Sequence, residues 1–134
     1  MKNSIFVLAG SIILFMVSMS FIVDIQDIWE VPEKYVNMEN PTSSDKESLK
    51  YGKSLYSKHC KSCHGKEGLG DGPKAAQLDT PSGDFTEEDF QSQSDGALFY
   101  KAREGRDDMP TFKKKIADDE DMWLIINYLR TLGE

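Results

Sequence analysis

The chain of 134 residues begins with a hydrophobic stretch: residues 5–23 carry no charged side chain and stand between Lys2 and Asp24. As a helix, this stretch would be roughly 28 Å long, close to the roughly 30 Å thickness of the hydrocarbon core of a bilayer. Its apolar residues lack the helical period that a core helix with one buried face would show. The pattern therefore predicts a hydrophobic N-terminal helix within 1–23 that can enter a membrane.

The charges on either side of this stretch predict its orientation. Lys2 precedes it, whereas Asp24 and Asp27 follow it, so the positive-inside rule puts everything after residue 23 on the exported side. Two alternatives remain open. Either the stretch is a permanent anchor that keeps the chain at the cell membrane, facing the periplasm, or it is a signal sequence cleaved near Ser18 and Ser20, which would release a soluble periplasmic protein.

Polar residues replace the hydrophobic run over 24–43. This segment contains Pro32 and Pro41 and shows no sustained period, which is typical of a linker. From residue 44 onward, apolar residues recur at helical spacing. The chain is thus predicted to consist of an anchor or signal over 1–23, a linker over 24–43 and one domain over 44–134.

The first helix of this domain is expected over 45–62. Ser44 and Glu47 form a capping-box pattern at its start, in which each side chain serves the other residue's backbone N–H. Four glycines between residues 65 and 72 then predict an irregular loop, because glycine is costly inside a helix.

The remaining segments also show a helical pattern. Short helices are expected after Thr86 and between Asp95 and Gly105. A longer one begins in the acidic run 118–121, where negative charge stabilises a helix N-terminus, and ends at Gly133. Its apolar stripe consists of Met122, Ile125, Ile126, Leu129 and Leu132. No strand pattern of convincing length is present, so the domain is predicted to be all-α with long loops.

Composition agrees with one globular domain and excludes some partners. With 39% hydrophobic and 29% charged residues, the chain has material for a modest core and is not a disordered tail. A formal net charge of −7 argues against a nucleic-acid-binding protein. Lys2 is the only charged side chain before Asp24, so the acidity belongs to the exported part. Its partners are therefore expected to dock through basic or mainly apolar surfaces.

Both cysteines of the chain lie in one motif, Cys60-Lys61-Ser62-Cys63-His64. C-x-x-C-H is the attachment signal of a c-type haem. At the end of a helix, two sulfurs three residues apart lie on one face and can reach the two vinyl groups along one haem edge. His64 then lies over the porphyrin plane, where its imidazole can bind the iron. The motif predicts one covalently bound haem c.

Three other interpretations of the motif are weaker. A thioredoxin-like dithiol needs a βαβ context, and no strands are predicted. A zinc site would draw its ligands from Cys60, Cys63, His64 and His59, which are too close in sequence to surround a tetrahedral ion easily. A disulfide between cysteines this close in a helix would be strained.

With this motif, the chain resembles the class I (monohaem) cytochromes c over 44–132. The resemblance rests on Gly52, Tyr56, Cys60, Cys63, His64, Gly65, the run Asp71-Gly72-Pro73, Met109, Pro110 and the 123–132 helix with Tyr128. It implies a fold in which the N- and C-terminal helices cross, with short helices and long loops around one covalent haem. It also implies that Gly52 meets Tyr128 and that the carbonyl of Pro73 orients His64.

The second axial ligand decides what such a haem can do. Candidates are His59, Met38, Met109 and Met122. His59 lies on the same side of the porphyrin as His64, Met38 lies in the predicted linker, and Met122 belongs to the apolar stripe. Pro110 favours an extended conformation for Met109, and the resemblance implies a Met-Pro pair in the ligand loop. Met109 is thus the expected sixth ligand of the iron, with His64 as the fifth.

These observations predict a one-electron carrier, and not an enzyme. The expected protein is an exported, membrane-tethered monohaem cytochrome that exchanges electrons with redox proteins in a respiratory chain. One alternative is a haem subunit or accessory domain fixed within a larger membrane oxidoreductase complex. Another is a haem gas sensor or enzyme with an open distal site, which Met109 disfavours.

Overall fold

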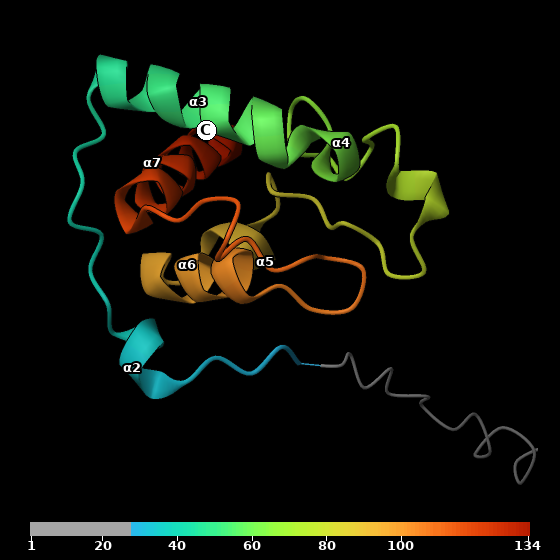
Figure 1. Ribbon diagram of the computed structural model, residues 1–134, viewed down its shortest axis with the longest axis horizontal. Helices are drawn as coiled ribbons and strands as arrows, with labels where there is room; N and C mark the ends of the chain where they lie inside the picture. The colour runs from blue at the N-terminus through green and yellow to red at the C-terminus, as the bar shows by residue number, and fades with distance from the viewer. Residues whose placement is uncertain (1–27) are drawn as a thin grey trace, which may run out of the picture. The chain divides into compact units, whose positions relative to one another are not determined.

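The computed structural model describes residues 28–134, and within them the regular structure is helical (Figure 1). The one extended pairing in this part is an isolated bridge between Arg106 and Met109. The helices are α2 (Glu33–Val36), α3 (Lys46–His59), α4 (Lys61–His64), α5 (Glu88–Gln91), α6 (Asp95–Glu104) and α7 (Asp119–Arg130), with 3₁₀ turns η1 (Ala75–Gln77) and η2 (Thr131–Gly133). The predicted all-α domain with long loops is confirmed.

The hydrophobic helix predicted within 1–23 lies outside the described residues. Of the helices from residue 28 onward, none has the length and apolar character needed to cross a bilayer.

Helix α3 starts one residue later than the capping box predicts. Asp45 is the N-cap, and its carboxylate accepts hydrogen bonds from the backbone N–H groups of Glu47 (2.9 Å) and Ser48 (3.0 Å). Ser43 donates its hydroxyl to the same carboxylate. A carboxylate is a charged acceptor and makes stronger bonds to the N-terminal N–H groups than the Ser44 hydroxyl would, so Asp45 takes the capping position.

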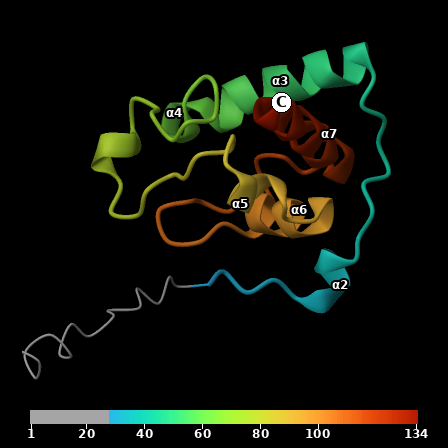
Figure 2. The same cartoon turned by 180° about the vertical axis from the view of Figure 1, so that it is seen from behind.

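Helices α3 and α7 cross in direct backbone contact, as both views show (Figures 1 and 2). The contact is made at Gly52: a Cβ built there would overlap the carbonyl oxygen of Leu124 and come within 2.8 Å of its carbonyl carbon and 3.4 Å of the Cβ of Tyr128. The predicted meeting of Gly52 and Tyr128 is confirmed, and the Leu124 carbonyl makes the tighter contact. A side chain at position 52 would force the helices apart.

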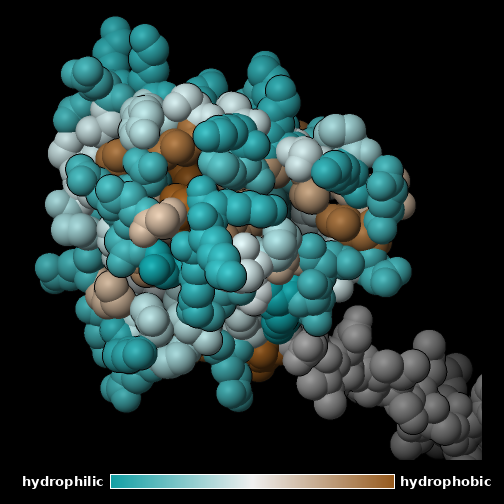
Figure 3. All heavy atoms as spheres, viewed as in Figure 1, coloured by the Kyte–Doolittle hydropathy of each residue, from teal (hydrophilic) through white to brown (hydrophobic). Residues whose placement is uncertain are grey.

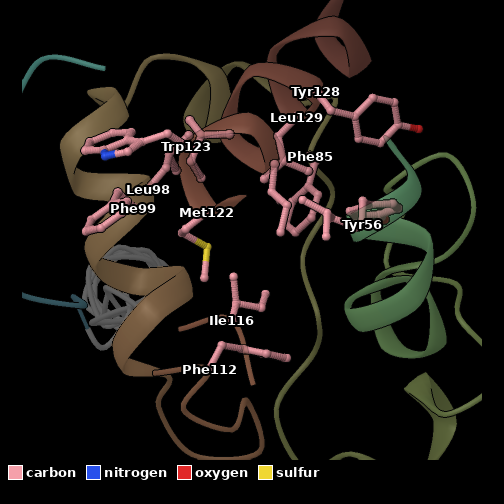
Figure 4. Close-up of a cluster of buried hydrophobic side chains, with 13 residues drawn as sticks. Tyr56, Phe85, Leu98, Phe99, Phe112, Ile116, Met122, Trp123, Tyr128 and Leu129 are labelled. Carbon is pink, nitrogen blue, oxygen red and sulfur yellow. The ribbon is translucent and has the colours of Figure 1, made fainter. Parts of the chain in front are cut away.

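Helix α7 forms the centre of the hydrophobic core (Figure 4). Every residue from Met122 to Leu129 is buried. Its predicted apolar stripe is confirmed, but the buried part of the helix is wider than the stripe because α3 covers one side and α6 another. Trp123 stacks on Phe99 of α6 with ring centroids 4.1 Å apart, and Tyr128 faces Tyr56 of α3 at 5.2 Å.

Residues 31–43 pack against the helical domain and belong to the same compact unit as the rest of the chain up to Glu134. Tyr35 of α2 lies 4.7 Å from Tyr100 of α6, centroid to centroid. A Cβ on Gly96 of α6 would come within 2.9 Å of Met38, so only glycine lets the segment lie this close. A linker was predicted over 24–43 because this segment has no sustained hydrophobic period. The prediction did not anticipate the packing, because the partners of the segment lie on α6, far away in the sequence.

Asn127, on the buried face of α7, fixes the end of this segment. It is 8% exposed. Its amide nitrogen donates to the hydroxyl of Thr42 and the carbonyl of Ser43, both at 2.9 Å, and its amide oxygen accepts from Asn40 at 2.8 Å. One buried amide thus satisfies three groups of the segment.

Asn127→Ala is expected to lower the free energy of unfolding by about 1–3 kcal/mol, because it leaves partly buried polar groups without partners. Urea denaturation of the purified protein measures this loss, and limited proteolysis should show faster cleavage within 31–43. Asn37→Ala, at an exposed position, is the matched control and should change neither. Equal proteolysis of both variants would show that Asn127 does not hold the segment.

Candidate functional site

The C-x-x-C-H motif forms a tight helical turn where α3 ends. Cys60 is the junction: its backbone (φ −117°, ψ −36°) interrupts the helix, and α4 starts at the next residue. The N–H groups of Cys63 and His64 both donate to the carbonyl of Cys60, at 3.2 and 3.1 Å. The predicted helix over 45–62 therefore ends at His59. Both cysteines are free and partly exposed as residues, and Cys63 follows Cys60 by about one helical turn.

The loop after the motif is folded back against it. The hydroxyl of Tyr56 donates to the carbonyl of Gly65 at 2.7 Å, and the N–H of Gly72 donates to the carbonyl of Cys63 at 3.1 Å. A Cβ on Gly72 would come within 2.6 Å of the carbonyl carbon of Cys63. The glycines predicted to form an irregular loop are thus needed for close backbone approach, which holds the cysteine pair in place.

The thiol of Cys60 does not have the character of a redox-active thiolate. Burial, and then the neighbouring Cys63, raise its pKa to about 12. Catalytic dithiols depend on a thiol whose pKa is lowered toward neutrality. A protonated thiol packed against the core therefore does not fit the dithiol interpretation of the motif.

His64 is buried among apolar groups, but its ring carries an unsatisfied polar atom. The imidazole stacks on Phe85, with centroids 4.5 Å apart. Its Nδ1 is buried and lacks a hydrogen-bond partner among the described residues, so Pro73, the acceptor that the resemblance implies, does not serve this atom here. Burial lowers the pKa of His64, partly offset by the nearby backbone of Ser82. A neutral imidazole is the form that binds a metal ion.

A cavity of about 410 Å³ is formed by residues of the segment 69–84, which approaches His64 through the backbone of Ser82. Its wall includes Ser82, whose hydroxyl, with Nδ1 of His64, is the second buried side-chain atom left without a hydrogen-bond partner in the part of the chain that is described. The cavity is lined by Leu69, Gly70, Ala75, Leu78, Asp79, Pro81, Ser82, Gly83 and Asp84. The two cysteine thiols and the His64 imidazole are the donor set that a covalent haem requires.

Met109 lies in a compact loop that follows α6. The backbones of Arg106 and Met109 pair in both directions, at 2.9 and 2.8 Å, and Asp107 between them has a positive φ of 51°. A Cβ on Gly105 would come within 2.5 Å of the carbonyl carbon of Pro110. The side chain of Met109 is partly buried and packs against the core, as expected of a methionine that points inward from a loop.

Asp108 joins this loop to the cavity wall. One of its carboxylate oxygens, Oδ2, accepts the backbone N–H of Asp79 at 2.7 Å and that of Thr80 at 2.9 Å. The segment 78–84 therefore contacts the Met109 loop near one end, and its Ser82 lies by His64 near the other. The sequence pattern did not single out Asp108, Ser82 or Phe85, since each acquires its role from a partner distant in sequence.

The other candidates for a second axial ligand occupy different places. Met122 is 1% exposed within the core between α6 and α7 (Figure 4). Met38 is 37% exposed and packs by Gly96 of α6. His59 is the last residue of α3, and its ring lies nearly perpendicular to that of Phe112, with the ring centroids 6.3 Å apart. Met109 alone among the four candidates stands in a loop tied to the cavity wall.

The sequence model of the family described as Cytochrome c matches residues 49–133. No curated protein sequence matches the chain. Among solved structures, a chain of the Kuenenia stuttgartiensis reducing HAO-like protein complex Kustc0457/Kustc0458 is similar, with 28% sequence identity and a TM-score of 0.62. The match covers 79% of this chain and 53% of that chain, so this chain spans about half the length of that structural relative.

Proposed function

Because the chain belongs to the cytochrome c family, whose members bind haem covalently and transfer electrons, we propose that it holds one haem c on Cys60, Cys63 and His64. The observation that carries this proposal is the turn at the end of α3, which brings together two free cysteines and a buried imidazole whose Nδ1 has no hydrogen-bond partner among the described residues. Thioethers at Cys60 and Cys63 would keep the group in a domain too small to enclose it fully.

Met109 is the proposed second axial ligand. Its thioether side chain is partly buried and stands in a loop that hydrogen bonds hold against the cavity wall. A haem iron with two protein ligands supplies reversible one-electron transfer between the ferric and ferrous states. The chain's own residues His64 and Met109 would hold the iron and exclude water from it, and the sulfur of Met109 would raise the reduction potential.

The surface of the protein is suited to brief contacts with other proteins. The face shown in Figure 3 is mostly hydrophilic, with hydrophobic groups in small, separate patches. Small and largely polar contacts are typical of transient redox encounters. We therefore propose a carrier whose donor and acceptor are redox proteins.

The test is the intact mass of the purified protein, measured together with its reduced and oxidised spectra. The expected mass exceeds that of the polypeptide by one haem, retained after denaturation, because the thioethers are covalent. The expected spectra are those of a six-coordinate haem whose reduced form does not bind CO. A mass equal to that of the polypeptide would contradict haem attachment, and CO binding by the untreated protein would favour the open-site alternative.

For location, we propose that residues 1–23 export the domain and hold it at the periplasmic face of the cell membrane as part of a respiratory chain. Support comes from the uncharged run 5–23 between Lys2 and Asp24. The same mass measurement tests cleavage, since removal of the signal would shorten the polypeptide and leave a soluble protein.

A fixed haem subunit of a larger complex is the second candidate. Two observations favour it: the similar solved chain belongs to a protein complex, and residues 31–43 are packed onto the domain. Only residues 24–30 would then separate the hydrophobic stretch from the packed unit, a reach of at most about 25 Å. Co-purification with a membrane complex would favour this candidate over a free carrier.

A further inference from the structure

We infer that Asp108 is a positioning residue that latches the Met109 loop to the segment 78–84 and so keeps the sixth coordination position of the iron closed. This inference rests on the proposed ligation by Met109. The family match does not itself point to Asp108, and the role follows from hydrogen bonds between segments that lie far apart in sequence.

The Met109 loop is rigid at its base. The N–H of Phe112 and the hydroxyl of Thr111 both donate to the carbonyl of Arg103, at 3.1 and 3.0 Å, and Gly105 passes close to Pro110. These bonds close the loop on itself but do not connect it to the cavity wall. The Met109 side chain packs against the core, and the hydrogen bonds between this loop and the cavity wall come from Asp108.

Asp108 supplies the connection at the loop tip. A single oxygen, Oδ2, accepts both N–H groups, from Asp79 and Thr80, at 2.7 and 2.9 Å. Charge-assisted hydrogen bonds of this length are stronger than neutral ones. Asp79 also lines the cavity, so the latch holds a cavity-lining residue directly against the residue that precedes Met109.

The latch also affects the part of the cavity wall near His64. The segment 78–84 that Asp108 holds includes Ser82, whose backbone lies next to His64. Opening the latch would thus loosen the segment between the two proposed axial ligands. All three latch residues are exposed, so the latch can open without unfolding the core, and its strength sets how often it does.

The test is ligand exchange in the purified haem protein. Asp108→Ala is expected to speed cyanide binding to the ferric protein about five- to tenfold, because Met109 must leave the iron before cyanide can enter. Hydrogen exchange at the amides of Asp79 and Thr80 should rise by a similar factor, and the free energy of unfolding should fall by no more than this factor represents, about 1.4 kcal/mol for tenfold.

Two further variants separate the hydrogen bonds from the charge. Asp108→Asn keeps a carbonyl oxygen where Oδ2 lies and should restore slow cyanide binding to within about twofold of the original protein, since one neutral acceptor can still hold both N–H groups. Asp107→Asn removes an equal charge at the neighbouring position, where asparagine tolerates the positive φ, and should leave both rates unchanged.

Each outcome bears on the inference. Unchanged cyanide binding in Asp108→Ala, equally fast binding in Asp108→Asn, or unchanged exchange at the amides of Asp79 and Thr80 would overturn the latch. Failure of the underlying ligand assignment is recognised separately: Met109→Ala would then leave the spectrum unchanged, whereas with a correct assignment and a wrong latch only the Asp108 variants would be silent.

Discussion

Met109→Ala is expected to remove the weak near-infrared absorption band of sulfur-to-ferric-iron charge transfer and to open the iron to cyanide and CO. The reason is that this loop methionine is the one candidate sulfur tied to the cavity wall, through Asp108. The reduction potential is expected to fall by on the order of 0.1 V or more, within the roughly 0.8 V range over which axial ligands act. Absorption spectra of the oxidised protein and a redox titration measure both effects.

Met38→Ala is the matched control for this change. It removes another thioether, from a side chain that packs by Gly96 in the segment lying against α6, and it should leave the band and the potential unchanged. Met122→Leu tests the core methionine and should cost less than about 1.5 kcal/mol of stability without a spectral change. A band that survives in Met109→Ala, or disappears in Met38→Ala, would refute the ligand assignment.

Gly52→Ala is expected to lower the free energy of unfolding by about 3 kcal/mol or more, a large part of the roughly 5–15 kcal/mol available to a domain. Helix propensity alone predicts the opposite, since alanine in a helix interior is about 1 kcal/mol more favourable than glycine. Packing decides whether this substitution stabilises or destabilises the protein. The new Cβ would overlap the Leu124 carbonyl, a backbone group that cannot rotate away.

Urea denaturation of the haem-containing protein measures this change, and haem content during expression reports it independently, because α3 carries the cysteines at its end. Gly83→Ala is the control: nothing lies within 4 Å of a Cβ there, although φ is +71°. It should cost only about 1–2 kcal/mol of backbone strain. A stabilised Gly52→Ala variant would show that the two helices do not cross as closely as described.

Local signals in the sequence were sufficient for several elements. The acidic residues before α7 and the glycine after α6 mark helix ends that the structure confirms, with Asp118 as N-cap and Gly105 as C-cap. The position of the N-cap of α3 was predicted one residue too early. Ser44 and Asp45 are both good capping residues, and the choice between them depends on small energetic differences that the pattern of residue types does not contain.

The packing of residues 31–43 could not be predicted because its partners are distant in sequence. In the sequence, Asn40 and Thr42 have the character of linker residues. In the folded protein, both form hydrogen bonds with the side-chain amide of Asn127 on α7. Asp108 likewise has the character of a turn residue in the sequence, and only the fold brings the backbone amides of Asp79 and Thr80 within hydrogen-bond distance of its carboxylate. Polar side chains carry no signal of the partner they will meet.

The sequence by itself determined the helical class, the cysteine–histidine motif and the family, because each depends on residue types at short, regular spacing. The tertiary structure decided how close α3 and α7 approach at Gly52 and which carboxylate joins two loops. These depend on contacts between residues separated by tens of positions, and folding alone creates them.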